Sequence, residues 1–289
     1  MVAFRSSLRR FAQQAVKTAA LGVDQVLPPK RGAVVLIYHR VGRTSQLEVD
    51  LPDSLFDEQM AMLADQRRAA TLDAALAAVG GAPTDGPADG LAGGSAGAID
   101  PVVVTFDDGT ADFVDRALPI LVRHGVPAVL YVATDFVEAQ RTFPDAGQPV
   151  SWAALRDAVS TGLVTIGSHT HTHALLDRLA PDAVAHELDR SIELIQDRLD
   201  IAAEHFAYPK ALSGHSDAAA AVRSRFRSAA VAGTRPNPYG ATDVYNLLRS
   251  PVQLADGMKW FERKVLGGMR AEDDLRRLAN RVRYVGATQ

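Results

Sequence analysis

The stretch PVVVTFDDG, residues 101–109, has the pattern of a buried strand that ends in two adjacent carboxylates. Residues 102–104 are apolar, β-branched valines, which favour an extended backbone, and Gly109 closes the run. Asp107 and Asp108 therefore follow the predicted strand directly. Because α/β folds build their sites where strands end, this pair is a candidate functional centre.

A second stretch, GSHTHTH at residues 167–173, places histidines after another short apolar run. Its His169, His171 and His173 come just past the predicted strand at 163–166. Two strand ends can thus bring carboxylate and imidazole donors together, which is the outline of a metal site. The chain has no cysteine, so a metal would have to use histidine, carboxylate and water.

Both motifs also have simpler interpretations. The Asp pair could form a strand-end turn with a helix cap. If the chain turns helically after the strand, His169 and His173 share one face and His171 points away, so His171 is left out of the site. If the strand continued instead, all three histidines would share a face.

Strands and helices alternate along the rest of the chain. Apolar runs predict further strands at 33–41, 126–133, 206–209, 229–232 and 247–248. Helical spacing of apolar residues predicts helices at 55–63, 73–79, 112–124, 150–159, 183–199 and 217–226. This alternation favours a mainly parallel sheet or barrel wrapped in helices.

Composition places limits on the class of protein. The 289 residues are 47% hydrophobic and 22% charged, which is ordinary for a soluble chain with one large domain. The net charge of −3 gives no reason to expect nucleic-acid binding through bulk charge. The lack of cysteine excludes disulfides but says little about the cellular compartment.

Three motifs in the chain, taken together, resemble a known family. TFDDG (105–109), the histidines of 169–173 and FAYP (206–209) occur in the order and spacing of the polysaccharide deacetylase domain, also called NodB-homology or carbohydrate esterase family 4. The resemblance covers roughly residues 33–250. The chain is similar to the branch of this family that includes poly-N-acetylglucosamine deacetylases. The similar features are YHRV at 38–41, LLR at 247–249 and a third motif without arginine.

This resemblance implies a fold and a function. The expected fold is a distorted (β/α) barrel of the NodB type, with its site at the carboxyl ends of the strands. The expected enzyme is a metal-dependent hydrolase that removes N-acetyl groups from an amino sugar in a glycan or glycolipid. Its metal ligands would be Asp108, His169 and His173, and its general base would be Asp107. Zinc is the first choice of metal, with cobalt, manganese and nickel as alternatives.

The resemblance also implies roles for residues further from the Asp pair. His39 is the candidate general acid, although it could be a satisfied strand-end histidine. Arg249 would orient or tune Asp107, although it could equally form a surface ion pair. A backbone N–H near the third motif would bind the oxyanion, which points to Tyr208 and Pro209.

The remaining segments lie outside these motifs. Residues 1–30 have a basic amphipathic pattern, broken by polar residues, which does not fit a signal peptide or a membrane-spanning helix. This segment could rest on an anionic membrane or pack on the domain, so a cytoplasmic or membrane-peripheral protein is expected. Residues 31–289 form the expected catalytic domain, in which the Gly- and Ala-rich stretch 80–100 is a flexible insertion.

Two other functions stay open at this point. A deformylase or O-acetyl esterase acting on a sugar would keep the same metal site. A glycan-binding protein without turnover would be expected to lack a metal ligand or Asp107. The three candidate ligands and Asp107 are all present. The chain also departs from the family where Lys210 and Ala211 replace an aromatic residue and a glycine after FAYP. Lys210 could contact an anionic group on the carbohydrate substrate.

Overall fold

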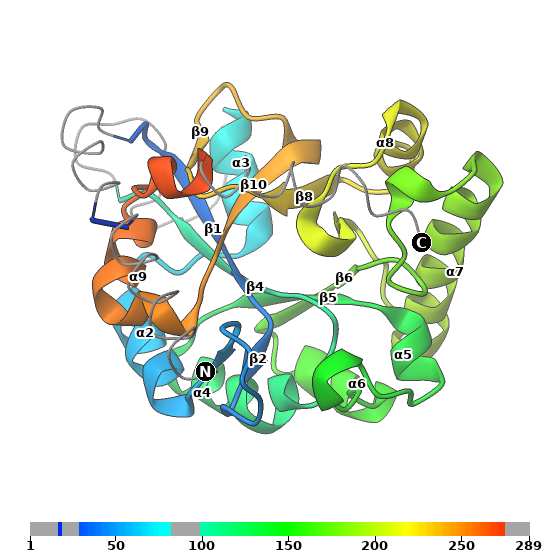
Figure 1. Ribbon diagram of the computed structural model, residues 1–289, viewed down its shortest axis with the longest axis horizontal. Coiled ribbons are helices and arrows are strands. Elements are labelled where there is room, and N and C mark those ends of the chain that lie inside the picture. Colours follow the sequence, from blue (N-terminus) through cyan, green and yellow to red (C-terminus); the bar gives the residue numbers. More distant parts are fainter. Residues whose placement is uncertain (1–16, 19–28, 82–98, 275–289) are drawn as a thin grey trace, which may run out of the picture.

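A closed barrel of seven parallel strands forms the centre of the computed structural model, which describes residues 17–18, 29–81 and 99–274 (Figure 1). The strands follow one another around the barrel in chain order, and β10 pairs with β1 to close it. They are β1 (Gly32–Tyr38), β4 (Val102–Phe106), β5 (Ala128–Val132), β6 (Val164–Ser168), β7 (His205–Ala207), β8 (Ser228–Ala232) and β10 (Leu247–Pro251). The predicted (β/α) barrel is therefore confirmed.

Three short strands complete the sheets. β2 (Arg40–Val41) and β3 (Asp50–Leu51) pair with each other just after β1. β9 (Asn237–Pro238) runs antiparallel to the start of β1, where Gly32 lies opposite Pro238. A Cβ at Gly32 would lie only 2.1 Å from the carbonyl oxygen of Asn237, so this close approach requires glycine.

The helices surround the barrel (Figure 1). The α-helices are α2 (Asp53–Asp65), α3 (Leu72–Gly80), α4 (Leu118–His124), α5 (Thr134–Glu138), α6 (Trp152–Ser160), α7 (Pro181–Leu199), α8 (Ser216–Arg223) and α9 (Gly257–Val265). Short 3₁₀ turns lie at η2 (Pro144–Ala146), η3 (Leu176–Arg178), η4 (Pro209–Ala211), η5 (Val244–Asn246) and η6 (Leu254–Asp256).

The helix predicted at 112–124 is not uniform. Its first part is a π-helical turn, η1 (Phe113–Ala117), and only Leu118–His124 is α-helical. Pro119 has no N–H to donate to the carbonyl four residues earlier, which accounts for the interruption in the α-helical ladder.

Side chains of the strands alternate between two cores, as the period of a strand requires. Val34, Leu36 and Tyr38 of β1 belong to the large cluster between barrel and helices. Ala33 and Val35 belong to a second cluster inside the barrel, with Val103, Val129 and Tyr131. That inner cluster also contains Leu72, Ala75 and Val79, so α3 closes the amino-terminal end of the barrel.

Part of the N-terminal segment packs on the domain. Lys17 is buried and donates a hydrogen bond to Asp256, which also accepts one from Lys264 at 2.7 Å. The rest of 1–28, and residues 82–98 of the predicted flexible insertion, lie outside the described residues. Among the residues that the structure describes, no helix has both the length and the apolar character needed to cross a membrane.

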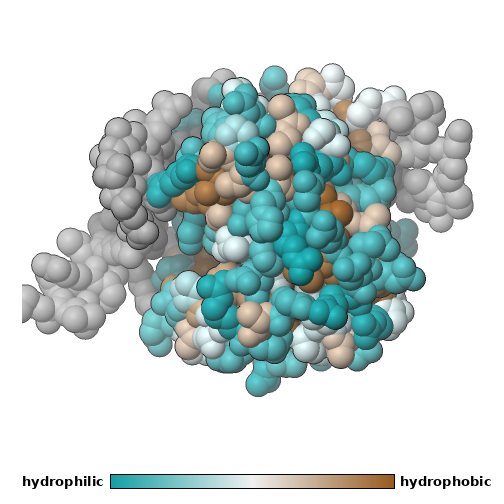
Figure 2. All heavy atoms as spheres, turned by 90° about the vertical axis from the view of Figure 1, so that its right-hand side faces the viewer, coloured by the Kyte–Doolittle hydropathy of each residue, from teal (hydrophilic) through white to brown (hydrophobic). Residues whose placement is uncertain are grey.

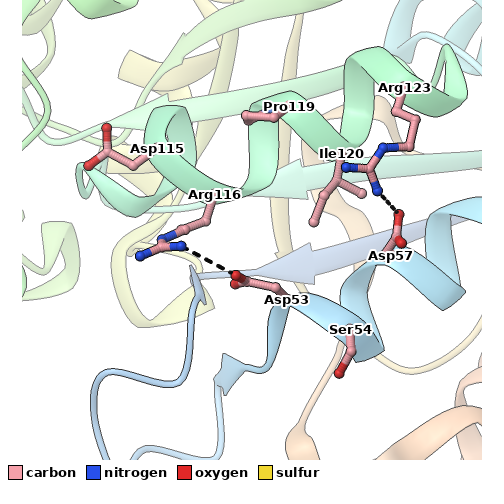
Figure 3. Close-up of a pocket in the computed structure, with 8 residues that line it drawn as sticks. All are labelled: Asp53, Ser54, Asp57, Asp115, Arg116, Pro119, Ile120 and Arg123. Atoms are coloured by element: carbon pink, nitrogen blue, oxygen red, sulfur yellow. Dashed lines mark hydrogen bonds and ion pairs between the residues drawn. The ribbon is translucent and has the colours of Figure 1, made fainter.

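The outer surface of the helical layer is mainly hydrophilic on the side viewed in Figure 2, where apolar residues form small separate patches. A hollow of about 380 Å³ lies between α2 and the η1–α4 helix (Figure 3). Arg116 faces Asp53 across it at 3.6 Å, and Arg123 pairs with Asp57 at 2.9 Å. None of the residues that line this hollow belongs to the site predicted from the sequence.

Candidate active site

The Asp pair lies directly after β4, at the carboxyl end of the barrel. The N–H of Asp107 donates to the carbonyl of Tyr38 at 3.1 Å and so extends the pairing of β4 with β1. Asp108 then adopts a left-handed backbone with φ of 76°, which is costly for a residue with a Cβ. This turn directs the two adjacent carboxylates to different partners.

His169 and His173 converge on Asp108. The Nε2 atoms of His169 and His173 lie 3.7 Å and 3.4 Å from Asp108 Oδ1, and the two rings are 5.0 Å apart. His169 Nδ1 lies 2.7 Å from the carbonyl oxygen of Ala207, which can only accept a hydrogen bond. The Nδ1–H therefore donates to Ala207, and the Nε2 lone pair faces Asp108.

The turn that brings these histidines together is not helical, so the helical interpretation of their spacing is wrong. Thr170 and His173 both have left-handed backbones, with φ of 66° and 64°. These two residues bend the chain so that His169 and His173 face the same point. His171 lies outside the cluster, because its Nδ1 is 2.9 Å from the hydroxyl of Thr134.

A residue that the sequence did not single out, Glu187 of α7, holds this turn. Its Oε2 accepts hydrogen bonds from the N–H groups of His171 at 3.0 Å and Thr172 at 2.8 Å. Its Oε1 accepts one from the Thr172 hydroxyl at 2.7 Å. The available signal was a glutamate on the apolar face of α7, beside Val184 and Leu188.

Arg249 forms a buried pair with Asp107. Its Nη1 donates to Asp107 Oδ1 at 2.6 Å and its Nη2 to Oδ2 at 2.9 Å, and its side chain is 0% exposed. The interpretation of Arg249 as a surface ion pair is therefore wrong. Burial raises the pKa of Asp107, but the charges of Arg249 and His169 outweigh it and hold that pKa below its ordinary value.

His39 follows β1 and is half-buried beside both carboxylates. Its Nδ1 is buried and has no hydrogen-bond partner among the described residues, which counts against the interpretation of His39 as a satisfied strand-end histidine. Burial raises the pKa of Asp108, but the hydrogen bond from His173 and the nearby charge of His39 outweigh it and lower that pKa. His39 thus lies in electrostatic contact with the candidate metal ligand.

Tyr208 and Pro209 do not fit the predicted oxyanion contact. The Tyr208 N–H donates to the carbonyl of Ala230 at 3.1 Å, and Pro209 has no N–H. The Tyr208 ring packs against Phe206, and burial raises its pKa to about 12. The prediction is wrong for this N–H because the chain uses it where β7 lies beside β8. The motif alone does not specify that strand pairing.

Comparison with known proteins finds a family match within the chain. Residues 95–227 match the model of the polysaccharide deacetylase family, and the match contains both the Asp pair and the histidine turn. These residues form a polysaccharide deacetylase domain. The deacetylase is therefore an enzyme that removes acetyl groups from a glycan. His39 and Arg249 lie outside the matched range but inside the same barrel.

Solved structures share the fold of the deacetylase. IcaB from Ammonifex degensii has a TM-score of 0.68 at 22% identity, covering 81% of this chain and 98% of that one. The Streptococcus pyogenes deacetylase PplD, solved with acetate, has a TM-score of 0.67 at 20% identity, covering 82% and 99%. A de-N-acetylase from Aggregatibacter actinomycetemcomitans has 0.65 at 17%, covering 80% and 99%. Among curated proteins, none matches this chain.

Proposed function

We propose that the deacetylase hydrolyses N-acetyl groups on an amino sugar of a glycan or glycolipid, using a divalent metal bound by Asp108, His169 and His173. The observation that carries this proposal is the convergence of one ligand atom from each of these residues within 4.8 Å of one another. The fold shared with a de-N-acetylase supports an amide rather than an ester as the substrate bond.

The donor set fits a zinc-like cation. One carboxylate and two imidazoles are three protein ligands, the number that leaves a position open in catalytic zinc sites. Burial lowers the pKa of His169 to about 4, so its ring is neutral at pH 7 and its Nε2 is free to bind. Cobalt, manganese and nickel accept the same donors. When bound, such a cation supplies Lewis-acid activation of water and of the acyl oxygen.

Asp107 acts as the general base in this proposal. Arg249 keeps its carboxylate ionised and fixes its orientation through two hydrogen bonds. Each carboxylate oxygen has a second lone pair, so Asp107 can still take a proton from the attacking water. The oxygen of that water bonds to the acyl carbon, and the carbon–nitrogen bond then breaks to release acetate.

His39 supplies the proton that the leaving amine requires. Its position at the end of β1 places an imidazole close enough to Asp107 and Asp108 for its charge to lower the pKa of both carboxyl groups. Its Nδ1 has no hydrogen-bond partner among the described residues. This leaves the ring able to donate to the departing nitrogen.

The test is acetate release from N-acetylglucosamine oligomers by zinc-loaded protein, with His169→Ala as the matched inactive variant. We expect release by the wild type and its loss in the variant, because that substitution removes one of three ligands. Release only from O-acetylated glycans, or formate release only from N-formyl sugars, would reassign the substrate bond. Bound zinc with no release from any of these would favour a glycan-binding protein without turnover.

Replacing Glu187 with glutamine should weaken zinc binding by about 10–100-fold, the usual effect of losing a residue that orients metal ligands. Glutamine keeps the size of the side chain but cannot accept all three hydrogen bonds from the histidine turn. Titration calorimetry of metal-free protein measures the effect directly. Glu193→Gln, an exposed change on the same helix, is the control, and equal zinc affinity in both variants would contradict the prediction.

A further inference from the structure

A second group of potential ligands lies at the amino-terminal end of the barrel, opposite the deacetylase site. Asp73 is in the first turn of α3, His205 begins β7, and Glu204 precedes it. One ligand atom from each of the three lies within 4.8 Å of the others. The residues of this group, which we call the amino-end cluster, have no part in the proposed hydrolysis.

His205 is the unusual member of the amino-end cluster. It is 1% exposed, and its Nδ1 lies 2.9 Å from the hydroxyl of Ser228. Its Nε2 is buried without a hydrogen-bond partner among the described residues and lies 3.6 Å from Asp73 Oδ1. Buried ring nitrogens are rarely left unpaired, because the loss of water is then uncompensated.

The surroundings of His205 resemble those of a metal-bound histidine. If Nδ1–H donates to the Ser228 hydroxyl, the Nε2 lone pair faces the carboxylates, which is how outer partners orient metal ligands. A nitrogen lone pair that faces two carboxylates is unfavourable unless a cation lies between them.

We propose that Asp73, Glu204 and His205 bind a zinc-like divalent cation. One imidazole and two carboxylates are common zinc ligands, and the imidazole favours a transition metal over magnesium or calcium. The cation would join α3 to β7 at the end of the barrel that α3 closes. Its expected role is structural, because the amino-terminal face of such barrels contributes to stability rather than catalysis.

Arg227 contacts both carboxylates of the amino-end cluster. Its Nη1 donates to Glu204 Oε2 at 2.8 Å, and its Nη2 lies 3.2 Å from Asp73 Oδ1. The Arg227 side chain is 56% exposed, so it can leave these carboxylates for water, and exposed ion pairs of this kind are weak. Cation and guanidinium therefore compete, and removing the guanidinium should tighten zinc binding.

The test uses full-length His169→Ala protein, in which the deacetylase site has lost a ligand, and zinc as the probe. Calorimetry together with elemental analysis should find about two zinc ions per chain in the wild type and about one in His169→Ala. Adding Asp73→Asn should abolish this remaining binding, and adding Arg227→Met should strengthen it. Asp73 is exposed at the start of α3, so its substitution leaves the core intact.

Asp189→Asn is the matched control, because Asp189 is another exposed aspartate paired with an arginine. Equal zinc binding in the Asp73→Asn and Asp189→Asn proteins would overturn the proposal, as would the absence of zinc from His169→Ala. The proposal does not depend on the deacetylase metal. If the wild type binds a single ion and only Asp73→Asn removes it, the result would support a metal site at the amino-end cluster and contradict the proposed catalytic metal.

Discussion

Asp107→Asn is expected to lower kcat for deacetylation by about 10²–10⁴-fold, the usual contribution of a positioned general base. Asparagine has the shape of aspartate but cannot take a proton from water. The metal ligands Asp108, His169 and His173 are unchanged, so zinc affinity should stay close to that of the wild type. The loss should therefore appear in kcat at saturating zinc.

Acetate release and zinc calorimetry on the same preparation separate these two effects. Asp115→Asn, an exposed change on η1, is the control for an aspartate substitution near the same strand. An Asp107→Asn enzyme that keeps more than about a tenth of its activity would contradict the role of general base. A large loss of zinc affinity would instead make Asp107 a part of the metal site.

Arg249→Met should destabilise the fold by about 3–5 kcal/mol, the cost of removing one partner from a buried ion pair. Methionine fills much of the same volume but leaves the Asp107 carboxylate without its counter-charge. The pKa of Asp107, now held below its ordinary value, should rise in this variant. Activity should fall as well, because less of the base is ionised.

The loss should depend on pH with a defined sign. In the wild type the folded-state pKa of Asp107 is lowered, so the pair stabilises the fold above the unfolded pKa of about 3.9 and loses this effect as pH falls further. The difference between wild type and Arg249→Met should be largest at neutral pH and shrink in acid. Urea unfolding at several pH values measures it.

Two further variants make the Arg249 prediction specific. Arg225→Met breaks a partly exposed pair with Asp189 and should cost no more than about 1 kcal/mol. The double variant Asp107→Asn with Arg249→Met removes both charges and should be more stable than Arg249→Met alone. If Arg249→Met is as stable as Arg225→Met, the buried pair does not support the barrel.

The sequence alone was sufficient for the barrel and for the two strand ends that carry the candidate ligands. Valine-rich runs, separated by helical spacing, predict parallel strands, and parallel strands bring Asp108 and His169 to one end. The order of the motifs then located the remaining candidates, His173 and Arg249. These predictions depend on patterns within single segments.

Features that depend on contacts between segments were not predicted. The histidine turn needs two left-handed residues, Thr170 and His173, which short-range patterns do not indicate. Glu187 reaches this turn from α7. The Tyr208 N–H donates to the carbonyl of Ala230 in β8. His205 and Asp73 likewise meet only when α3 closes the barrel.

The pairing of β10 with β1 has a consequence for the order in which the protein can be made. A ribosome releases β1 and the Asp107 strand long before Arg249, which follows Asp107 by 142 residues. Until β10 emerges, the growing chain has an open sheet and an Asp107 without its counter-charge. An incomplete nascent chain therefore cannot assemble the proposed base, and activity begins only when the last strand of the barrel is in place.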